Sequence, residues 1–255
     1  MKFNFIQYFF FLIISGGFCQ NSISSLSRSD LEMGEKIKLS GKKLMEQKYG
    51  FVFISNDSSL NKEILIIGVH GWKSDGYEWI YGLKTFSNEY KYTYFYRYNW
   101  DVCPDSASDK LADDLILLIG ETLGIEKLII FGHSYGGVVV TKLASKLHYN
   151  IPIEIHSIAS PLRGYKSLNT RCEIEKKQDG SINYYSWDKN ILHFQWRTQH
   201  KLDGAFRKMK IDPQQIDLFD SRVTQLPNSM NGKRLGHNWS ITWVVNEFLR
   251  IPHKL

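Results

Sequence analysis

The chain has 255 residues, of which 43% are hydrophobic and 23% are charged, and it contains no low-complexity tract, so we expect one globular domain with a sizeable core. The formal charge is +6, but the charges are scattered without a basic helix or an Arg-rich run, which excludes nucleic acid as an expected partner. The excess of positive charge mainly favours solubility. Peripheral contact with an anionic lipid surface stays open as a possibility.

The N-terminus has the pattern of a secretory signal peptide. An apolar run from Phe3 to Ile14 follows a single Lys2 and precedes the small residues 15–17. We therefore predict a signal peptide over residues 1–19 and a secreted or extracytoplasmic protein. The alternative is a membrane anchor that is not cleaved, although the apolar run is shorter than the roughly 20 residues that span a bilayer.

Three cysteines occur in the chain, and cleavage near Cys19 would leave Cys103 and Cys172. An even pair in an oxidising compartment could form a disulfide. Spacing alone does not show whether the two Cα atoms come within bridging distance. A disulfide and two free cysteines both stay open.

The first part of the chain after the signal peptide is predicted to contain a polar lead-in followed by the first strands of a sheet. Residues 20–35 are polar and Ser-rich, which predicts an exposed lead-in to a domain over 36–255. Residues 36–55 are expected to form an antiparallel, hairpin-like start. The continuous apolar run Ile64–Val69 is typical of a strand buried on both faces of a sheet.

Strands and helices then alternate to the end of the chain. Within this pattern Ser106 is the expected N-cap of one helix, with Asp109 three residues later and Gly124 at its end. A polar segment, 164–190, interrupts the alternation of strands and helices and is interpreted as an insertion that caps one end of the sheet. The other predicted elements are helices Tyr77–Glu89, Tyr135–Leu147 and Trp239–Leu249, and strands Tyr92–Tyr98, Lys127–Phe131, Ile153–Ile158, Ile191–Arg197 and, more weakly, Arg222–Leu226. This alternation predicts an α/β fold with a mostly parallel sheet, helices on both faces and right-handed crossovers.

The segment Gly132-His133-Ser134-Tyr135-Gly136 joins a predicted buried strand directly to a predicted helix. A sharp turn here projects the Ser134 hydroxyl above the sheet, and the two flanking glycines let the strand and helix backbones pass closely. The alternative is a turn without chemistry or one that binds a phosphate at the helix N-terminus. A phosphate loop would normally bring more glycines or a lysine.

A second motif, His70-Gly71-Trp72, follows the strand that ends at Val69. Acyl transfer needs two backbone N–H groups directed at the developing oxyanion, and those of Trp72 and Tyr135 are the expected donors. His70 and His133 are interpreted as structural histidines of these two turns.

The two motifs, together with the late pair Gly236-His237, resemble the α/β-hydrolase superfamily, especially its lipases and esterases, over roughly residues 36–250. The resemblance implies an α/β-hydrolase fold with Ser134 as nucleophile. Members of this superfamily place nucleophile, acid and histidine in that chain order, which makes His237 the expected base. Asp203 is the expected acid because it follows a predicted strand and precedes Gly204, with Asp217 and Asp220 as alternatives.

These features predict a secreted serine hydrolase that cleaves carboxylic esters, with a small-molecule or lipid ester as substrate. A thioesterase, an amidase or a lipid-remodelling deacylase would share the same fold and catalytic residues, so these activities stay open as alternatives. A catalytically silent binding protein on this scaffold is the alternative from another class. No cofactor is expected and no metal, since the sequence has neither a His-Glu-x-x-His helix nor a spaced zinc-binding cysteine set.

Overall fold

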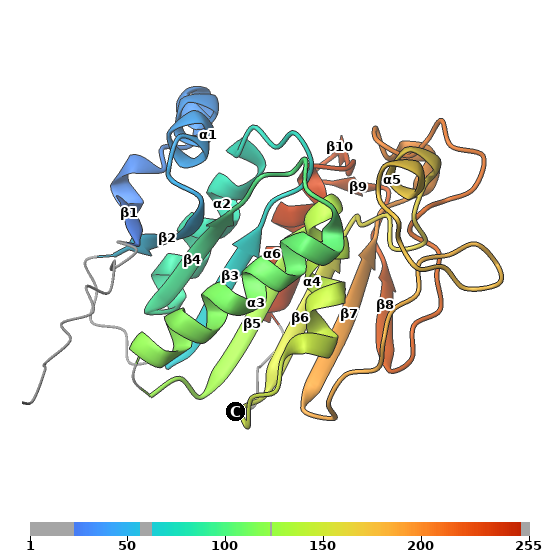
Figure 1. Cartoon of the computed structure of the whole chain (residues 1–255). Coiled ribbons are helices and arrows are strands. Elements are labelled where there is room, and N and C mark those ends of the chain that lie inside the picture. The colour runs from blue at the N-terminus through green and yellow to red at the C-terminus, as the bar shows by residue number, and fades with distance from the viewer. Residues whose placement is uncertain (1–22, 57–62, 123, 251–255) are drawn as a thin grey trace, which may run out of the picture.

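A computed structural model describes residues 23–56, 63–122 and 124–250, with the side chains of Lys166, Ser167 and Asn169 left out. Its centre is an eight-stranded sheet of order β1-β2-β4-β3-β5-β6-β7-β8, in which every neighbouring pair is parallel except β2 and β4 (Figure 1). The predicted fold class, a mostly parallel α/β sheet, is confirmed. The strands of this sheet are β1 (Ser24–Ser27), β2 (Gly50–Ser55), β3 (Ile64–Val69), β4 (Tyr92–Arg97), β5 (Lys127–His133), β6 (Ile153–Ile158), β7 (Ile191–Arg197) and β8 (Ser221–Gln225).

Helices cover both faces of the sheet and create two separate cores (Figure 1). One face carries α3 and α4, and the other carries α2 and α6, with α1 packed on α2. The helices are α1 (Ile37–Met45), α2 (Tyr77–Glu89), α3 (Pro104–Glu121), α4 (Tyr135–Leu143), α5 (Lys166–Arg171) and α6 (Trp239–Arg250), and a small hairpin consists of β9 (Ser229–Met230) and β10 (Lys233–Arg234).

The run Ile64–Val69 shows why one strand can serve both cores. Its side chains alternate between the faces, so that Leu65 and Ile67 enter the core beneath α3 and α4 while Ile66 enters the core beneath α2 and α6. All six residues of β3 are buried. A continuous apolar run is therefore what this central position requires.

The start of the domain differs from the prediction of a hairpin over 36–55. Only β2 is a strand, and it pairs with β4, whereas residues 37–45 form α1. The helix buries Ser40, Gly41 and Leu44, a helical spacing, against α2. Gly41 permits this contact, because a Cβ there would lie 2.4 Å from the backbone nitrogen of Tyr77.

The lead-in predicted over 20–35 is partly built into the domain. Within its described part, β1 adds a parallel edge strand to β2, and Leu31 is fully buried in the core beneath α2. The segment is therefore not only an exposed lead-in, because β1 and Leu31 belong to the domain, although residues 33–35 are exposed as predicted. The predicted signal peptide lies outside the described residues.

Helix α3 begins earlier than predicted, at Pro104 after an N-cap residue Cys103, so Ser106 is not its cap. Proline suits the first helical position because the N–H that it lacks would have no helical partner there. The helix ends at Glu121 and not at Gly124. Similarly, the predicted helix 135–147 consists of α4 followed by a short 3-10 turn over 144–146.

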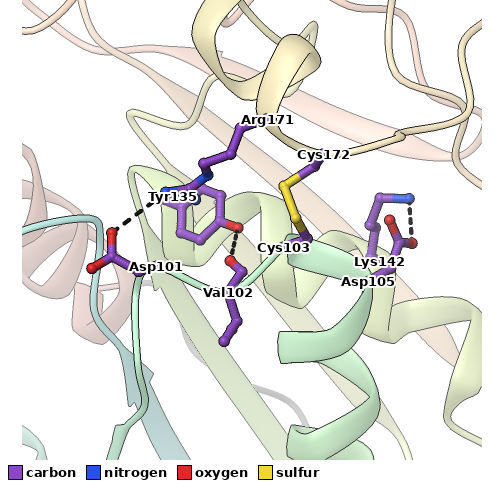
Figure 2. Close-up of a disulfide and its surroundings, with 8 residues drawn as sticks. All are labelled: Asp101, Val102, Cys103, Asp105, Tyr135, Lys142, Arg171 and Cys172. Atoms are coloured by element: carbon purple, nitrogen blue, oxygen red, sulfur yellow. Dashed lines mark hydrogen bonds and ion pairs between the residues drawn. A yellow bond between two sulfur atoms is a disulfide. The ribbon is translucent and has the colours of Figure 1, made fainter.

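The segment 164–190 contains α5 and is fixed to the body of the domain by a disulfide between Cys103 and Cys172 (Figure 2). The two Cα atoms lie 5.6 Å apart. An ion pair of 3.4 Å between Arg171 and Asp101 runs beside the disulfide. The question of a disulfide, which the sequence left open, is decided in favour of the bridge, while the role of the segment as a cap stays a prediction.

No helix in the described part of the chain is long and apolar enough to cross a membrane.

Candidate active site

Ser134 lies at the point where the direction of chain crossover changes. The chain leaves β3 toward α2 on one face of the sheet, whereas it leaves the neighbouring β5 toward α4 on the other face. The loops after these two strands therefore diverge at the carboxyl ends of the strands, which is where ligands bind in open α/β sheets.

The turn at Ser134 is as sharp as the motif requires. Strand β5 ends at His133 and helix α4 begins at Tyr135, so that Ser134 alone connects them. Its backbone angles are φ 54° and ψ −121°, a conformation that residues other than glycine rarely adopt. The N–H of Ser134 donates to the Ile158 carbonyl at 2.8 Å, which attaches the turn to β6.

Glycines around this turn are required by close backbone contacts. A Cβ on Gly136 would lie 2.4 Å from the His70 carbonyl oxygen, and a Cβ on Gly132 would lie 2.5 Å from the Gly136 carbonyl oxygen. A Cβ on Gly71 would lie 2.9 Å from the Cβ of Ser134. The loop after β3 therefore lies directly against the serine, as the pairing of the two motifs predicts.

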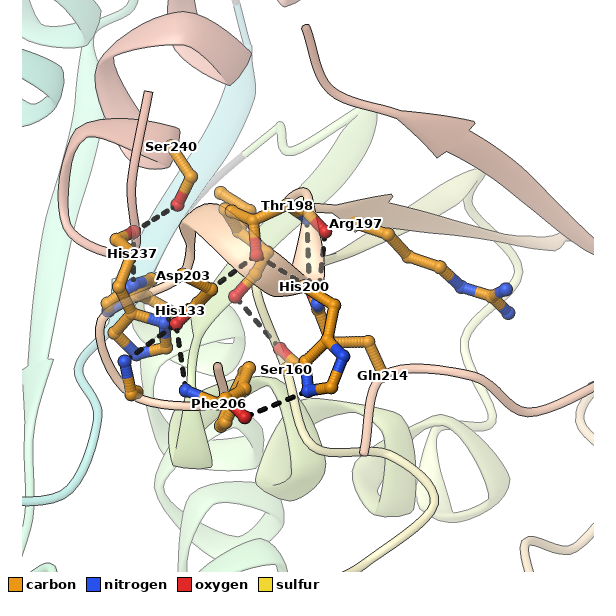
Figure 3. Close-up of polar contacts among 12 residues, drawn as sticks. His133, Ser160, Arg197, Thr198, His200, Asp203, Phe206, Gln214, His237 and Ser240 are labelled. Atoms are coloured by element: carbon orange, nitrogen blue, oxygen red, sulfur yellow. Dashed lines mark hydrogen bonds and ion pairs between the residues drawn. The ribbon is translucent and has the colours of Figure 1, made fainter. Parts of the chain in front are cut away.

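Asp203 and His237 are joined by a hydrogen bond of 3.0 Å between Oδ2 and Nδ1 (Figure 3). Asp203 follows β7 and is fully buried, whereas the His237 side chain keeps 14% of its surface exposed. With Nδ1–H donated to the carboxylate, the remaining ring nitrogen of His237 carries a free lone pair. The alternatives Asp217 and Asp220 have no contact with His237 among the described residues.

Asp203 is held ionised by its surroundings. Burial raises its pKa, but the hydrogen bond and charge of His237, the Thr198 hydroxyl and the Ala205 N–H outweigh burial, and the net effect lowers the pKa. The Ala205 N–H donates to Oδ1 at 2.8 Å and the Phe206 N–H at 3.2 Å. A buried carboxylate with this many donors stays charged and orients its histidine.

Besides Asp203, two aromatic side chains hold His237 in place. The His133 ring lies 4.6 Å away, and its Nε2–H donates to the His237 carbonyl oxygen at 3.1 Å. The Phe206 ring meets the His237 ring edge to face at 5.0 Å. Burial lowers the pKa of His133 to about 3, so it remains a neutral donor and is not a competing base.

His70 is a structural histidine of the first motif. Its Nδ1–H donates to the Gly71 carbonyl oxygen at 2.9 Å, and its Nε2 accepts from the Tyr98 N–H at 3.2 Å. Burial lowers its pKa to about 4. Both nitrogens are thus used to shape the turn that precedes Trp72.

The fold brings all the predicted site residues to one edge of the sheet, but not every expected hydrogen bond between them is formed. The Ser134 hydroxyl forms no hydrogen bond within the described part of the chain, so its expected bond to His237 is not made in this state. Catalytic hydrogen bonds are often long in structures without a bound substrate. Tyr135 is the first residue of α4, so its N–H has no partner in the helix, and the Trp72 N–H donates to no described residue.

Several supporting residues were not found by sequence reasoning. Thr198 donates its hydroxyl hydrogen to Asp203, and Gln214 Oε1 accepts from the Thr198 N–H at 2.9 Å. A polar Thr198 directly after a buried strand was the one available signal. Nothing local pointed to Phe206 or Gln214, because their role depends on how the loop after β7 folds back.

In the part of the chain that the structure describes, no group of three or more His, Cys, Asp or Glu side chains is placed to hold a metal ion.

No protein-family model matches the chain, and no curated protein matches it. Among solved structures it is similar to a lipase-esterase related protein from Clostridium acetobutylicum (13% identity, 78% of this chain and 98% of that chain, TM-score 0.45). It is also similar to Est1E from Butyrivibrio proteoclasticus (13%, 79% and 98%, 0.47) and to acyl-protein thioesterase 2 from Zea mays (13%, 79% and 99%, 0.42). The structure itself shows an α/β fold built on a mostly parallel eight-stranded sheet.

Proposed function

We propose that the protein is an exported serine hydrolase that cleaves carboxylic esters of small molecules or lipids through Ser134, His237 and Asp203. The observation that carries the proposal is the strained turn at Ser134 on the same sheet edge as the Asp203–His237 pair, which is joined at 3.0 Å. A turn without chemistry has no need of a serine in this conformation or of a buried carboxylate behind a partly exposed histidine.

The mechanism follows from the positions of these groups. Substrate binding would bring His237 Nε2 to the Ser134 hydroxyl, and His237 would accept its proton as Oγ attacks the ester carbonyl. Asp203 stabilises the imidazolium that forms. The N–H groups of Trp72 and Tyr135 are the proposed donors to the oxyanion. Collapse releases the alcohol with the proton from His237, and water then hydrolyses the acyl-enzyme by the same steps.

Export is part of the proposal. The N-terminal pattern supports it, and so does the bridge between Cys103 and Cys172, because structural disulfides persist mainly in oxidising compartments.

The first test of this function is labelling of the purified protein with a fluorophosphonate, comparing wild type with Ser134→Ala. We expect wild type to label and the variant to fold without labelling. Hydrolysis of p-nitrophenyl esters of graded chain length then defines the acyl preference. A folded wild type that never labels would support the catalytically silent binding protein instead.

The acid is tested by Asp203→Asn. An amide at this position favours the wrong histidine tautomer, and we expect kcat to fall by about 10³–10⁴-fold. Asp217→Asn is the matched control, because Asp217 is exposed and has no described contact with His237. Equal activity of the two variants would refute the assignment of Asp203.

A further inference from the structure

Unpaired positive charge gathers on the loop that contains Asp203. Between residues 200 and 211, which we call the acid loop, the cations Lys201, Arg207, Lys208 and Lys210 are all exposed. Within the described chain none of them forms an ion pair. The one acidic residue of the loop, Asp203, is buried and engaged with His237. All the exposed charge of the acid loop is therefore positive, which the sequence analysis did not recognise.

Hydrogen bonds and a ring contact fix the acid loop to the candidate active site. Besides the two N–H donors to its carboxylate, the backbone carbonyl of Asp203 accepts from the Arg207 N–H at 2.9 Å. His200 contacts the Phe206 carbonyl at 2.8 Å (Figure 3). Because the Phe206 ring packs on His237, the backbone segment that bears these cations is fixed beside the proposed base.

Two further segments add positive charge around the same residues. The hairpin residues Lys233 and Arg234 are exposed, and a Cβ on Gly236 would lie 3.5 Å from the Leu202 carbonyl and 3.7 Å from Arg234 Nε. The hairpin is thus a neighbour of the acid loop. On the side of Ser134, Lys73 is exposed and its ammonium lies 4.4 Å above the Trp72 ring.

Large apolar side chains are exposed among these cations. Trp72 follows the glycine that touches Ser134 and is 47% exposed, and Trp239 follows His237 by two residues and is 50% exposed. Ile211, at the end of the acid loop, is 61% exposed. Indole rings and long cationic side chains together are the composition of surfaces that sit in a lipid headgroup layer.

Few exposed acids offset this charge. Asp101 is paired with Arg171 and also accepts from the Trp72 indole N–H, and Asp75 is the exposed acid nearest in sequence to Lys73. Asp212 accepts hydrogen bonds from the N–H and the side chain of Gln214.

We infer that the surface formed by residues 72–73, 200–211, 233–234 and 239, here called the rim, docks the protein on an anionic phospholipid bilayer with Ser134 facing the lipid. The assignment of an ester-bearing lipid as substrate rests on the proposed function, whereas the docking itself does not. Cations supply attraction to the headgroups, and Trp72, Trp239 and Ile211 supply apolar insertion, which a purely electrostatic nucleic-acid surface would not need.

The test uses the Ser134→Ala protein, so that lipid is not consumed, and measures co-sedimentation with vesicles of phosphatidylcholine alone or mixed with phosphatidylglycerol. We expect binding to the mixed vesicles only, weakening as salt is raised. Adding Arg207→Gln, Lys208→Gln and Lys210→Gln should lower the partition coefficient by about tenfold or more.

The matched control replaces Lys91, Lys110 and Lys189 by glutamine, which removes the same charge from other exposed positions and should leave the partition coefficient unchanged. Thermal melts establish that both triple variants fold. A second measurement needs no charge variant: Trp72→Ala and Trp239→Ala should each weaken binding to the same vesicles.

Three results would overturn the inference: no binding of folded protein to the mixed vesicles, equal loss in both triple variants, or rim-dependent binding to heparin without binding to vesicles. Fluorophosphonate labelling of wild type separates these from a failure of the proposed function. Labelling without docking would leave a soluble esterase, and docking without labelling would leave a lipid-binding protein.

Discussion

Strain at a single residue distinguishes this serine from an ordinary surface hydroxyl. Ser134 holds φ 54° between β5 and α4, and its N–H bond to Ile158 keeps it there. Backbone conformations of this kind cost about 1–3 kcal/mol and persist where the surroundings enforce them. Because Gly71 and Gly136 remove the side chains that would clash, the surrounding backbone can hold Ser134 in this conformation.

Replacing Ser134 by glycine should therefore stabilise the protein while abolishing turnover. Glycine adopts this conformation without a Cβ penalty, and we expect the free energy of unfolding to rise by about 1 kcal/mol in urea titrations. Ser134→Ala is the control, since it removes the hydroxyl but keeps the strain. If both variants unfold at the same urea concentration, the backbone at residue 134 is not strained.

Among the helices and strands, those fixed by local sequence pattern were predicted correctly, whereas an element that depends on a distant contact was not. The central strands β3, β5 and β6 lie where the apolar runs predict them, because strands buried on both faces leave an unambiguous signature. Residues 37–45 read as part of a hairpin but form α1, and its one buried stripe depends on contact with α2 through Gly41. The local sequence did not reveal that partner.

The bridge between Cys103 and Cys172 joins two elements that are distant in the chain. It closes a separation of 69 residues and secures the end of α5 to the start of α3 (Figure 2). Chain entropy alone gives such a cross-link about 4 kcal/mol of stabilisation. We expect the Cys103→Ser, Cys172→Ser double variant to lose stability of this order in urea titrations. Reductant should lower the stability of wild type equally, and a double variant as stable as wild type would contradict this account.

Three of the buried histidines, whose pKa values burial lowers, set the acid sensitivity of the whole molecule. Burial lowers the pKa of His70 to about 4 and those of His133 and His193 to about 3. Each is therefore neutral in the folded protein, whereas in the unfolded chain each binds a proton near its ordinary pKa of about 6.5. The unfolded state consequently gains protons first as the pH falls.

We expect the free energy of unfolding to fall between about pH 6.5 and pH 4, by about 1.4 kcal/mol per pH unit for each of these histidines. Asp203 does not contribute in this window, because its lowered pKa places its loss of stabilisation below its ordinary value of 3.8. Urea titrations at a series of pH values measure the slope. A stability that stays flat over this range would show that the histidines are accessible to protons in the folded state.

The sequence by itself predicted the parallel α/β sheet and the turn at Ser134, because each follows from a contiguous pattern of strand, turn and helix. The roles expected of His237 and Asp203 came from the chain order of the superfamily that the sequence resembles, with Asp217 and Asp220 left open as alternatives to Asp203. Only the tertiary structure decided the cysteine bridge, the helix α1 and the contacts of Thr198 and Phe206 with the acid and the base. These depend on where distant segments meet. The gathering of cations beside the site has the same cause, since the acid loop turns its one acid inward to His237 and leaves its basic side chains facing the solvent.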